Sequence, residues 1–230
     1  MRTRVFVLRI LSAVGIEGAA RLGLVAAFLV SGLLVAAPQA QASTVYNLTS
    51  DHCTGGCGTA PFGDVTLDQN GTTVDITVSL NSPNWFVKTS SVDLMAFKFN
   101  GIGVIVGDIT VDQTVAGQTL SAASGVFNGD GTGPFGFGIS CGTCGTGASD
   151  KFNVDIVFHV ANATIADLTT PNVPQGNVFV ADILSDAALG GTGNTGPVDA
   201  TTPVPEPATL AMLSGGLVGL ASFGRRHPRS

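Results

Sequence analysis

The sequence contains no arginine between Arg21 and Arg225, so most of its positive charge lies at the two ends. From Ser43 to Glu206, three lysines stand against fifteen carboxylates, which gives this part of the chain a net charge of −12. Proteins that bind nucleic acid or anionic lipid neutralise phosphate with Lys and Arg. The missing bases therefore argue against nucleic acid as a partner and favour a soluble acidic domain.

The residue types that most often perform catalysis are also scarce. Between the two ends the chain has only His52 and His159, a single tryptophan, Trp85, and no glutamate before Glu206. It has no Gly-x-Ser-x-Gly elbow and no His-Glu-x-x-His helix, and it lacks the paired glutamates and aromatic platform of sugar-cleaving clefts. We therefore expect no enzyme activity, no cofactor and no resident metal.

Glycine, threonine, serine, asparagine and valine are abundant, whereas strong helix formers are few. Apolar and polar residues alternate from Thr73 to Leu80 and again from Phe152 to Val160, which is the period of a half-buried strand. Asn70-Gly71 separates the first run from Val65 and Leu67, and this spacing predicts a hairpin. The pattern indicates an all-β domain, a β-sandwich or jelly-roll-like fold, over residues 43–189.

Less regular strands are expected at Thr44–Thr49, Trp85–Lys88, Leu94–Asn100, Val104–Val111, Gly136–Ser140 and Val178–Leu184. A helical turn is indicated only at Ile183–Leu189. Residues 190–203, GGTGNTGPVDATTP, have the composition of a flexible linker. We expect this linker to hold the domain away from a membrane.

Residues 1–42 have the pattern of an export signal. Four arginines form a long basic region, Leu22–Ala37 is the apolar core, and Ala40-Gln41-Ala42 is a small-x-small cleavage site. We expect signal peptidase to cut between Ala42 and Ser43. The alternative, an uncleaved anchor, is disfavoured because the cleavage site follows the core at the expected distance.

Residues 204–230 form a second terminal signal. Pro205-Glu206-Pro207 precedes an apolar stretch at residues 208–223, and Arg225 and Arg226 follow it. A helix of this length reaches roughly 24 Å, short of a hydrocarbon core of about 30 Å, and the bases favour the cytoplasmic side. The prolines hold the preceding segment extended. We expect a marginal transmembrane helix that serves as a temporary anchor.

This tail resembles the PEP-CTERM sorting signal of Gram-negative bacteria. The resemblance rests on Pro205, Glu206 and Pro207, on the glycine-containing apolar segment, and on Arg225 and Arg226. In that family the signal is recognised by an exosortase, a membrane cysteine protease, in organisms that make exopolysaccharide. The resemblance implies a processing step and a destination, but no activity for the rest of the chain.

The four cysteines are the sharpest chemistry between the two signals: Cys53 and Cys57 lie in HCTGGC, and Cys141 and Cys144 in CGTC. An even number in an oxidising compartment predicts two disulfides. Local and crossed pairing both remain open, and glycine inside each loop favours local pairing. A zinc site and a redox Cys-x-x-Cys are the alternatives, but a redox cysteine needs a helix start, whereas the glycine-rich setting predicts a loop.

Two weaker patterns concern ligands and catalysis. Asp155 and His159 are expected on the polar face of one strand, where they would serve as acid and base if the chain were a hydrolase. Asn128–Gly133, NGDGTG, is similar to a calcium loop but lacks its alternating ligands and terminal glutamate. A plain turn is the expected structure there.

Taken together, these patterns predict an exported structural or adhesive protein of the cell surface or the exopolysaccharide matrix. It is expected to be anchored first in the inner membrane through residues 208–223 and then processed. Its expected partners are signal peptidase, an exosortase and exopolysaccharide. The alternative is an extracellular carbohydrate- or calcium-binding module or, more remotely, a secreted hydrolase.

Overall fold

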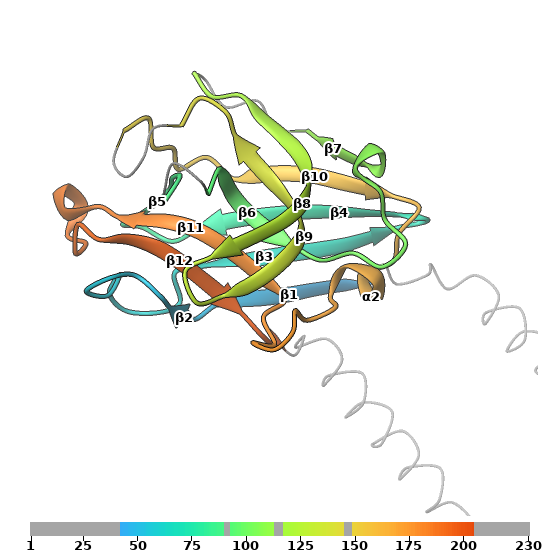
Figure 1. The fold of residues 1–230 in the computed structure, drawn as a ribbon, viewed down its shortest axis with the longest axis horizontal. Coiled ribbons are helices and arrows are strands. Elements are labelled where there is room, and N and C mark those ends of the chain that lie inside the picture. Colours follow the sequence, from blue (N-terminus) through green and yellow to red (C-terminus); the bar gives the residue numbers. More distant parts are fainter. Residues whose placement is uncertain (1–41, 90–92, 113–116, 145–148, 205–230) are drawn as a thin grey trace, which may run out of the picture. The chain divides into compact units, whose positions relative to one another are not determined.

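A computed structural model describes residues 42–89, 93–112, 117–144 and 149–204, which form two antiparallel sheets (Figure 1). The strands are β1 (Ser43–Leu48), β2 (Ser50–Asp51), β3 (Gly63–Asn70), β4 (Thr73–Leu80), β5 (Asn84–Phe86), β6 (Met95–Phe99), β7 (Ile109–Val111), β8 (Leu120–Gly129), β9 (Gly133–Cys141), β10 (Ile156–Ala161), β11 (Phe179–Ser185), β12 (Thr195–Ala200) and β13 (Pro203–Val204). The short helical elements are η1 (Val106–Asp108), α2 (Ile165–Leu168) and η2 (Ala187–Leu189).

Sheet A has the strand order β13-β1-β3-β4-β10-β7. At its centre, Asn70 of β3 pairs with Thr73 of β4, and Gly71 in the two-residue turn has φ +63°. Glycine adopts this backbone angle without steric cost, so the Asn-Gly hairpin prediction is confirmed. Along β4 and β10 buried and partly exposed residues alternate, which places one face of sheet A against the interior.

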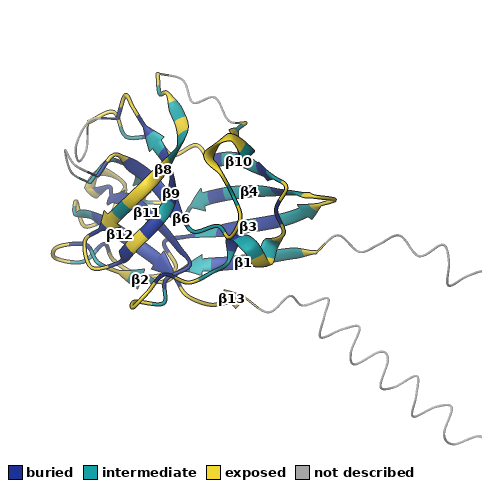
Figure 2. Ribbon diagram, turned by 45° about the vertical axis from the view of Figure 1, so that its right-hand side comes forward, coloured by how far each residue is buried: buried dark blue, intermediate teal, exposed yellow. Residues whose placement is uncertain are grey.

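Sheet B has the strand order β2-β12-β11-β6-β9-β8, and β5 also pairs with β11. Every residue of β11 is buried, so this strand reads as a continuous run without alternation (Figure 2). Strands β5 and β6 lie end to end along one side of it, paired with residues 183–185 and 179–181. Asp182 lies between these two stretches, and its carbonyl oxygen accepts a hydrogen bond from Val87 N at 3.1 Å.

The inner faces of the two sheets meet in a core rich in phenylalanine. Phe97 and Phe99 of β6 contact Phe158 of β10, with ring centroids 6.0 and 5.4 Å apart. Phe179 of β11 meets Tyr46 of β1 edge-on at 5.0 Å. Because Phe158 and Tyr46 belong to sheet A and the others to sheet B, these contacts join the two layers, and the all-β prediction is confirmed.

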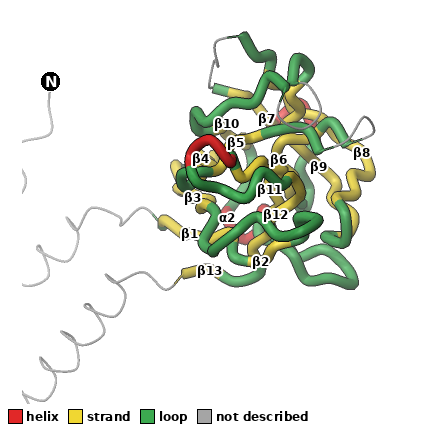
Figure 3. Tube along the Cα trace, turned by 90° about the vertical axis from the view of Figure 1, so that its left-hand side faces the viewer, coloured by secondary structure: helices red, strands yellow, loops and turns green. Residues whose placement is uncertain are grey.

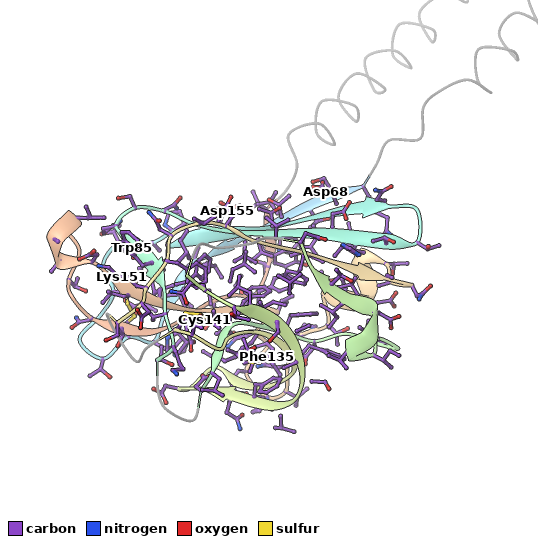
Figure 4. The ribbon with its side chains drawn as sticks, turned by 90° about the horizontal axis from the view of Figure 1, so that it is seen from above. Asp68, Trp85, Phe135, Cys141, Lys151 and Asp155 are labelled. Carbon is purple, nitrogen blue, oxygen red and sulfur yellow. A yellow bond between two sulfur atoms is a disulfide. The ribbon has the colours of Figure 1, made fainter. Side chains whose placement is uncertain are left out.

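Strands β8 and β9 form one end of sheet B, and the tip of their hairpin curls back over the outer face of that sheet, on the side away from sheet A (Figure 4). Thr132 in its turn is fully buried, and its carbonyl oxygen accepts hydrogen bonds from the side-chain amides of Asn172 and Asn177 at 2.6 and 3.0 Å. Phe135, just after the turn, is 1% exposed. The hairpin tip is therefore fixed to the loop that precedes β11.

The predicted linker at residues 190–203 is wrong. Thr195–Ala200 forms β12, which pairs with β11 over six residues and is buried at five of them. The glycine and proline of this strand are untypical of strands. Gly196 is required by packing, because a Cβ there would lie 2.5 Å from Cys53 Cα. The folded domain therefore extends beyond residue 189, to Val204.

Three further elements differ from the predictions. The strand expected over Val104–Val111 is confined to β7, because Val106–Asp108 forms η1. Strand β8 is not predicted by the sequence, because the small residues of LSAASG show no alternation. The helical turn expected over Ile183–Leu189 is confined to η2, since residues 183–185 belong to β11.

Among the described residues, no helix is both long enough and apolar enough to cross a membrane. The expected membrane segment at 208–223 lies outside the described residues, as does the export signal up to residue 41. Both segments stay predictions.

Candidate functional site

Three rows of outward-pointing side chains cross sheet A, and we call this surface the outer face of sheet A. The strand register gives the rows as Asn47, Asp64 and Ser79; Val45, Thr66, Thr77 and Val157; and Ser43, Asp68, Asp75, His159 and Thr110. Hydroxyl and carboxylate groups dominate these positions. Figure 4 shows Asp68 and Asp155 on this face, directed away from the packed interior.

The outer face of sheet A is acidic, and none of the outward positions in these rows is a lysine or arginine. Asp68 lies directly opposite Asp75. Partial burial raises the pKa of Asp64, the hydroxyl of Thr66 lowers it, and the charge of Asp155 raises it again, so the net shift is upward. Such a surface attracts cationic groups and offers many acceptors to a ligand rich in hydroxyls.

His159 lies on this face but pairs with Asp112, a partner that the sequence pattern did not indicate. Its Nδ1 is 3.0 Å from Asp112 Oδ1 and 2.8 Å from Oδ2. Across the neighbouring strands it stands opposite Asp75 and Thr110. Asp155 lies just before β10 on the same face. The contacts make His159 one partner of a partly exposed hydrogen-bonded pair, and among the described residues they bring no serine to it.

A second histidine contact involves His52, which follows β2. Its Nε2 lies 2.6 Å from Asp199 Oδ2 and 3.3 Å from Ser50 Oγ. A Ser-His-Asp hydrolase needs the serine and the carboxylate on opposite ring nitrogens, whereas here both approach the same one. Burial raises the pKa of Asp199, and the hydrogen bond from His52 opposes this rise. The arrangement therefore anchors β2 to β12 rather than preparing a nucleophile.

Both cystines close locally, as Cys53–Cys57 and Cys141–Cys144. In the first loop the two glycines have φ +88° and +82°, which fits the idea that glycine makes so short a ring feasible. The carboxylate of Asp51 accepts hydrogen bonds from Cys53 N at 2.8 Å and Cys57 N at 2.7 Å. This loop is therefore a capped structural turn.

Within the described part of the chain, the surroundings of both cystines are those of structural cross-links. Asp51, Cys53 and Cys57 do bring ligand atoms within 4.8 Å of one another, but the sulfurs are bonded together and the carboxylate oxygens already accept N–H groups. Cys141 ends strand β9 rather than starting a helix, and Cys141 and Cys144 are 1% and 2% exposed. A redox-active cysteine starts a helix, a position that Cys141 does not occupy.

The segment Asn128–Gly133 forms the end of β8 and the turn into β9, so the prediction of a turn is confirmed. The Thr132 hydroxyl donates to Gly129 O at 3.2 Å, and the Thr132 carbonyl oxygen is taken by two asparagine amides. These contacts hold the turn shut with groups of the protein itself.

The predicted signal-cleavage site lies at the start of sheet A. Ser43 is the first residue of β1, and the carbonyl oxygen of Ala42 accepts a hydrogen bond from Gln69 N at 2.8 Å. Ala40 lies outside the described residues. The sheet thus starts at the residue that would become the new amino terminus.

At the other end, Pro203 and Val204 form β13, which pairs with Tyr46 and Val45 of β1 (Figure 3). The sorting residues lie beyond it, outside the described residues: Pro205, Glu206, Pro207, Arg225 and Arg226. Among protein-family models, the one described as the PEP-CTERM protein-sorting motif matches residues 203–226. The chain carries a PEP-CTERM sorting motif. No curated protein and no solved structure matches the chain.

The PEP-CTERM match implies processing by an exosortase and indicates export to a surface or extracellular location. The matched region begins at Pro203, the first residue of β13, so the motif follows the folded domain without a spacer. The motif says nothing about what the domain contacts after delivery.

Proposed function

We propose that this chain is a non-catalytic structural or adhesive protein of the cell surface or exopolysaccharide matrix, sorted by an exosortase. The observation that carries the proposal is the PEP-CTERM motif at residues 203–226, joined directly to a folded all-β domain. A protein with this destination needs a stable fold and an accessible face. The sandwich and the outer face of sheet A supply these two features.

In the proposed route, signal peptidase cuts between Ala42 and Ser43, and residues 208–223 hold the protein in the inner membrane. The exosortase then cuts near Pro205–Pro207. Because β1 and β13 pair, the first and last strands of the processed protein would lie side by side. Both cuts would thus fall close to one edge of sheet A.

The outer face of sheet A is the proposed contact surface. The hydroxyls of Thr66 and Thr77 donate and accept hydrogen bonds, and the carboxylates of Asp68 and Asp75 accept them. These four residues occupy neighbouring register positions on β3 and β4. A sugar polymer presents hydroxyl groups at short intervals, which such an array of donors and acceptors would bind through many weak contacts.

Fractionation of the native host tests the route. The mass of the protein in the matrix fraction should correspond to a chain that starts at Ser43 and ends near Pro205–Pro207. A strain without the exosortase should retain the tailed form in the inner membrane, as should a Glu206→Ala variant, whereas Thr201→Ala should be processed normally. An intact tail on membrane-bound protein in the unmodified host would contradict the proposal.

Charge reversal tests the contact surface. We expect Asp68→Lys combined with Asp75→Lys to release the processed protein from the matrix into the medium. Asp130→Lys combined with Asp150→Lys makes the same charge change at exposed positions elsewhere and should leave retention unchanged. Equal retention of both double variants would show that the outer face of sheet A is not the contact surface.

Calcium distinguishes this proposal from a cation-binding module. A ligand that binds only the folded state raises the melting temperature. We expect millimolar calcium to leave the melting temperature unchanged apart from ionic-strength effects, which magnesium would reproduce. A calcium-specific rise would favour the cation-binding alternative.

A further inference from the structure

Sheet B contains a buried lysine that lies between two carboxylates. The side chain of Lys98, in β6, is 0% exposed, and its Nζ lies 2.8 Å from Asp182 Oδ1 and 2.9 Å from Asp93 Oδ2. The side chain of Asp182 is also 0% exposed, and that of Asp93 is 9% exposed. The second oxygen of Asp182 accepts a hydrogen bond from Thr89 Oγ1 at 2.8 Å. We call these four residues the Lys98 cluster.

The strand register holds the reacting groups together. Lys98 pairs with Val180, so Asp182 is the next residue along β11 on the same face. The β8–β9 hairpin covers the amine, because a Cβ placed on Gly129 would lie 3.4 Å from Lys98 Nζ. Asp182 sits at the gap between β5 and β6, where Thr89 can reach it. The fold thus presses an amine against a carboxyl group and shields both from water.

The charges of the Lys98 cluster do not balance when all its groups are ionised. One ammonium faces two carboxylates, in a place where burial disfavours every charge. Burial raises the pKa of Asp182 to about 6, even though Lys98 lowers it. Burial lowers the pKa of Lys98, but the charges of Asp182 and Asp93 raise it, and the net shift is upward. The neutral amine therefore forms by proton transfer within the cluster, which leaves it beside a carboxylic acid and removes two of the buried charges.

We propose that Lys98 and Asp182 condense into an internal amide bond that cross-links β6 to β11. The side-chain nitrogen of Lys98 is the nucleophile, the carboxyl carbon of Asp182 is the electrophile, and Asp93 carries the proton between them. No external reagent is required, since the only other product is one water molecule. The inference concerns the covalent state of the domain and is independent of the proposed surface role.

The steps balance as follows in atoms and charge. Asp93 carries one proton from the Lys98 ammonium to the Asp182 carboxylate, which leaves a neutral amine, a carboxylic acid and the Asp93 carboxylate. The neutral amine adds to the Asp182 carboxyl carbon, forming the C–N bond, while the Thr89 hydroxyl stabilises the developing oxyanion. Asp93 then takes a second proton from the bonded nitrogen and passes it to the departing hydroxyl, the C–O bond breaks and water leaves. One ammonium and one carboxylate become one amide and one water.

Proximity supplies the driving force that free amines and acids lack in water. Groups held in reacting geometry behave as if present at effective concentrations of about 10⁵–10⁸ M, and a dry site does not return the water for hydrolysis. Asp182 is the acceptor rather than Asp93, because it is fully buried and Thr89 binds its second oxygen. Asp93, which is slightly exposed, is better placed to exchange protons with solvent.

The chain provides its own comparison pair. Lys151 Nζ contacts Asp186 Oδ2 and lies 4.8 Å from the centre of the Trp85 ring, and Figure 4 shows Lys151 and Trp85 side by side. The side chains of Lys151 and Asp186 are 26% and 12% exposed. No second carboxylate is paired with this lysine among the described salt bridges. We expect this pair to remain an ordinary ion pair.

Tryptic mapping of the exported, folded protein from its host tests the proposal. Between the signals, trypsin can cut only after Lys88, Lys98 and Lys151. An amide at Lys98 blocks the second cut and joins residues 89–151 to the peptide that begins at Phe152. After reduction, this branched species should be lighter than the sum of its parts by about 18 Da, one water. Fragment spectra should place the bond between residues 98 and 182.

Several results would overturn the inference. Complete cleavage after Lys98, with every peptide at its sequence mass, would show a free lysine. A loss of one water without branching would place the bond within residues 89–151, as in a Lys98–Asp93 amide or an Asp130–Gly131 imide. These readings come from the unmodified protein, so they hold whether or not any variant folds.

Variants then assign the roles. Asp93→Asn keeps the size and the acceptor for Met95 N but removes the proton carrier, so cleavage after Lys98 should return in the folded variant. Asp186→Asn, at the comparison pair, should leave the branched peptide at its full yield. Undiminished branching in Asp93→Asn would refute the role of Asp93.

Discussion

The outer face of sheet A contacts solvent, whereas much of the outer face of sheet B is covered by protein. Both faces carry aspartates. The outer face of sheet A keeps Asp64, Asp68 and Asp75 partly exposed, with hydroxyl groups between them. On the outer face of sheet B, which the curled tip of the β8–β9 hairpin covers, Asp182 is 0% and Asp199 1% exposed. An aspartate is therefore left to solvent on one sheet and enclosed by protein on the other.

This difference shows where the few bases of the domain are needed. Water hydrates the exposed carboxylates of sheet A, so the rows of its outer face require no lysine as a partner. On sheet B, each enclosed carboxylate has a nitrogen partner: Lys98 for Asp182 and His52 for Asp199. Burying a carboxylate without such a partner costs several kcal/mol. The scarcity of bases thus reflects the small number of buried acids.

The largest expected effect comes from removing the buried base. Lys98→Met leaves Asp182 and Asp93 without their shared cation, and it also removes the proposed cross-link. We expect the free energy of unfolding to fall by about 3–5 kcal/mol, measured by urea denaturation. Lys151→Met, at the less deeply buried Lys151–Asp186 pair, should change the free energy of unfolding far less. Similar losses in both variants would mean that enclosure does not distinguish the two pairs.

The pH dependence of stability separates a free Lys98–Asp182 pair from a bonded one. The ordinary pKa of an aspartate is 3.8, and burial raises that of Asp182 to about 6. Between these values the folded state of a free pair binds more protons than the unfolded state, so stability falls as the pH rises. Above about pH 6 the loss is complete.

We therefore expect the melting temperature of Asp93→Asn to fall between about pH 4 and 6 relative to that of the unmodified protein. Burial, the largest cause of the shift, is retained in this variant, whereas Asp182 in an amide cannot titrate. The raised pKa values of Asp64 and Asp199 contribute equally to both proteins and cancel in the comparison. Parallel profiles would indicate that Asp182 has the same covalent state in both.

The two hairpins provide a third comparison. Gly133 has φ +86°, and a Cβ there would lie 2.8 Å from Nδ2 of the buried Asn172, whereas Gly71 has φ +63° and open space around it. Gly71→Ala should cost about 1–2 kcal/mol through backbone strain alone. Gly133→Ala should cost about 2–5 kcal/mol, since overpacking adds to the strain. Equal losses in the free energy of unfolding, measured by urea denaturation, would show that the tip of the β8–β9 hairpin is not tightly packed.

Sheet A was the readily predicted half of the fold. Its strands are buried on one face only, so β3, β4 and β10 alternate and the Asn-Gly turn marks their connection. Strands β6, β11 and β12 of sheet B are covered on both sides, and their sequences lose the period of two. The composition of β12 predicts a linker, because its glycine and proline make contacts with other strands that no local sequence pattern reveals.

The sequence carries a signal for the Lys98 cluster. Lys98 stands between Phe97 and Phe99, and Asp182 stands within FVADIL, so each is a single charge inside an apolar strand. Such a charge is buried, and a buried charge needs a partner. Which acid meets which base depends on strand order, and Lys98 and Asp182 are 84 positions apart in the sequence. The sorting motif needed no such information, because an enzyme reads it as a linear sequence.

The smallest expected effect concerns the exposed acids of sheet A. Asp68 and Asp75 face each other directly on β3 and β4, and like charges in this position repel. Asp68→Asn should raise the free energy of unfolding by about 0.2–1 kcal/mol at low ionic strength, and the gain should shrink as salt screens the repulsion. Denaturation in urea at two salt concentrations measures both quantities. A loss of stability at low salt would mean that the acidic rows are held by specific contacts, and the contrast with the enclosed acids of sheet B would then fail.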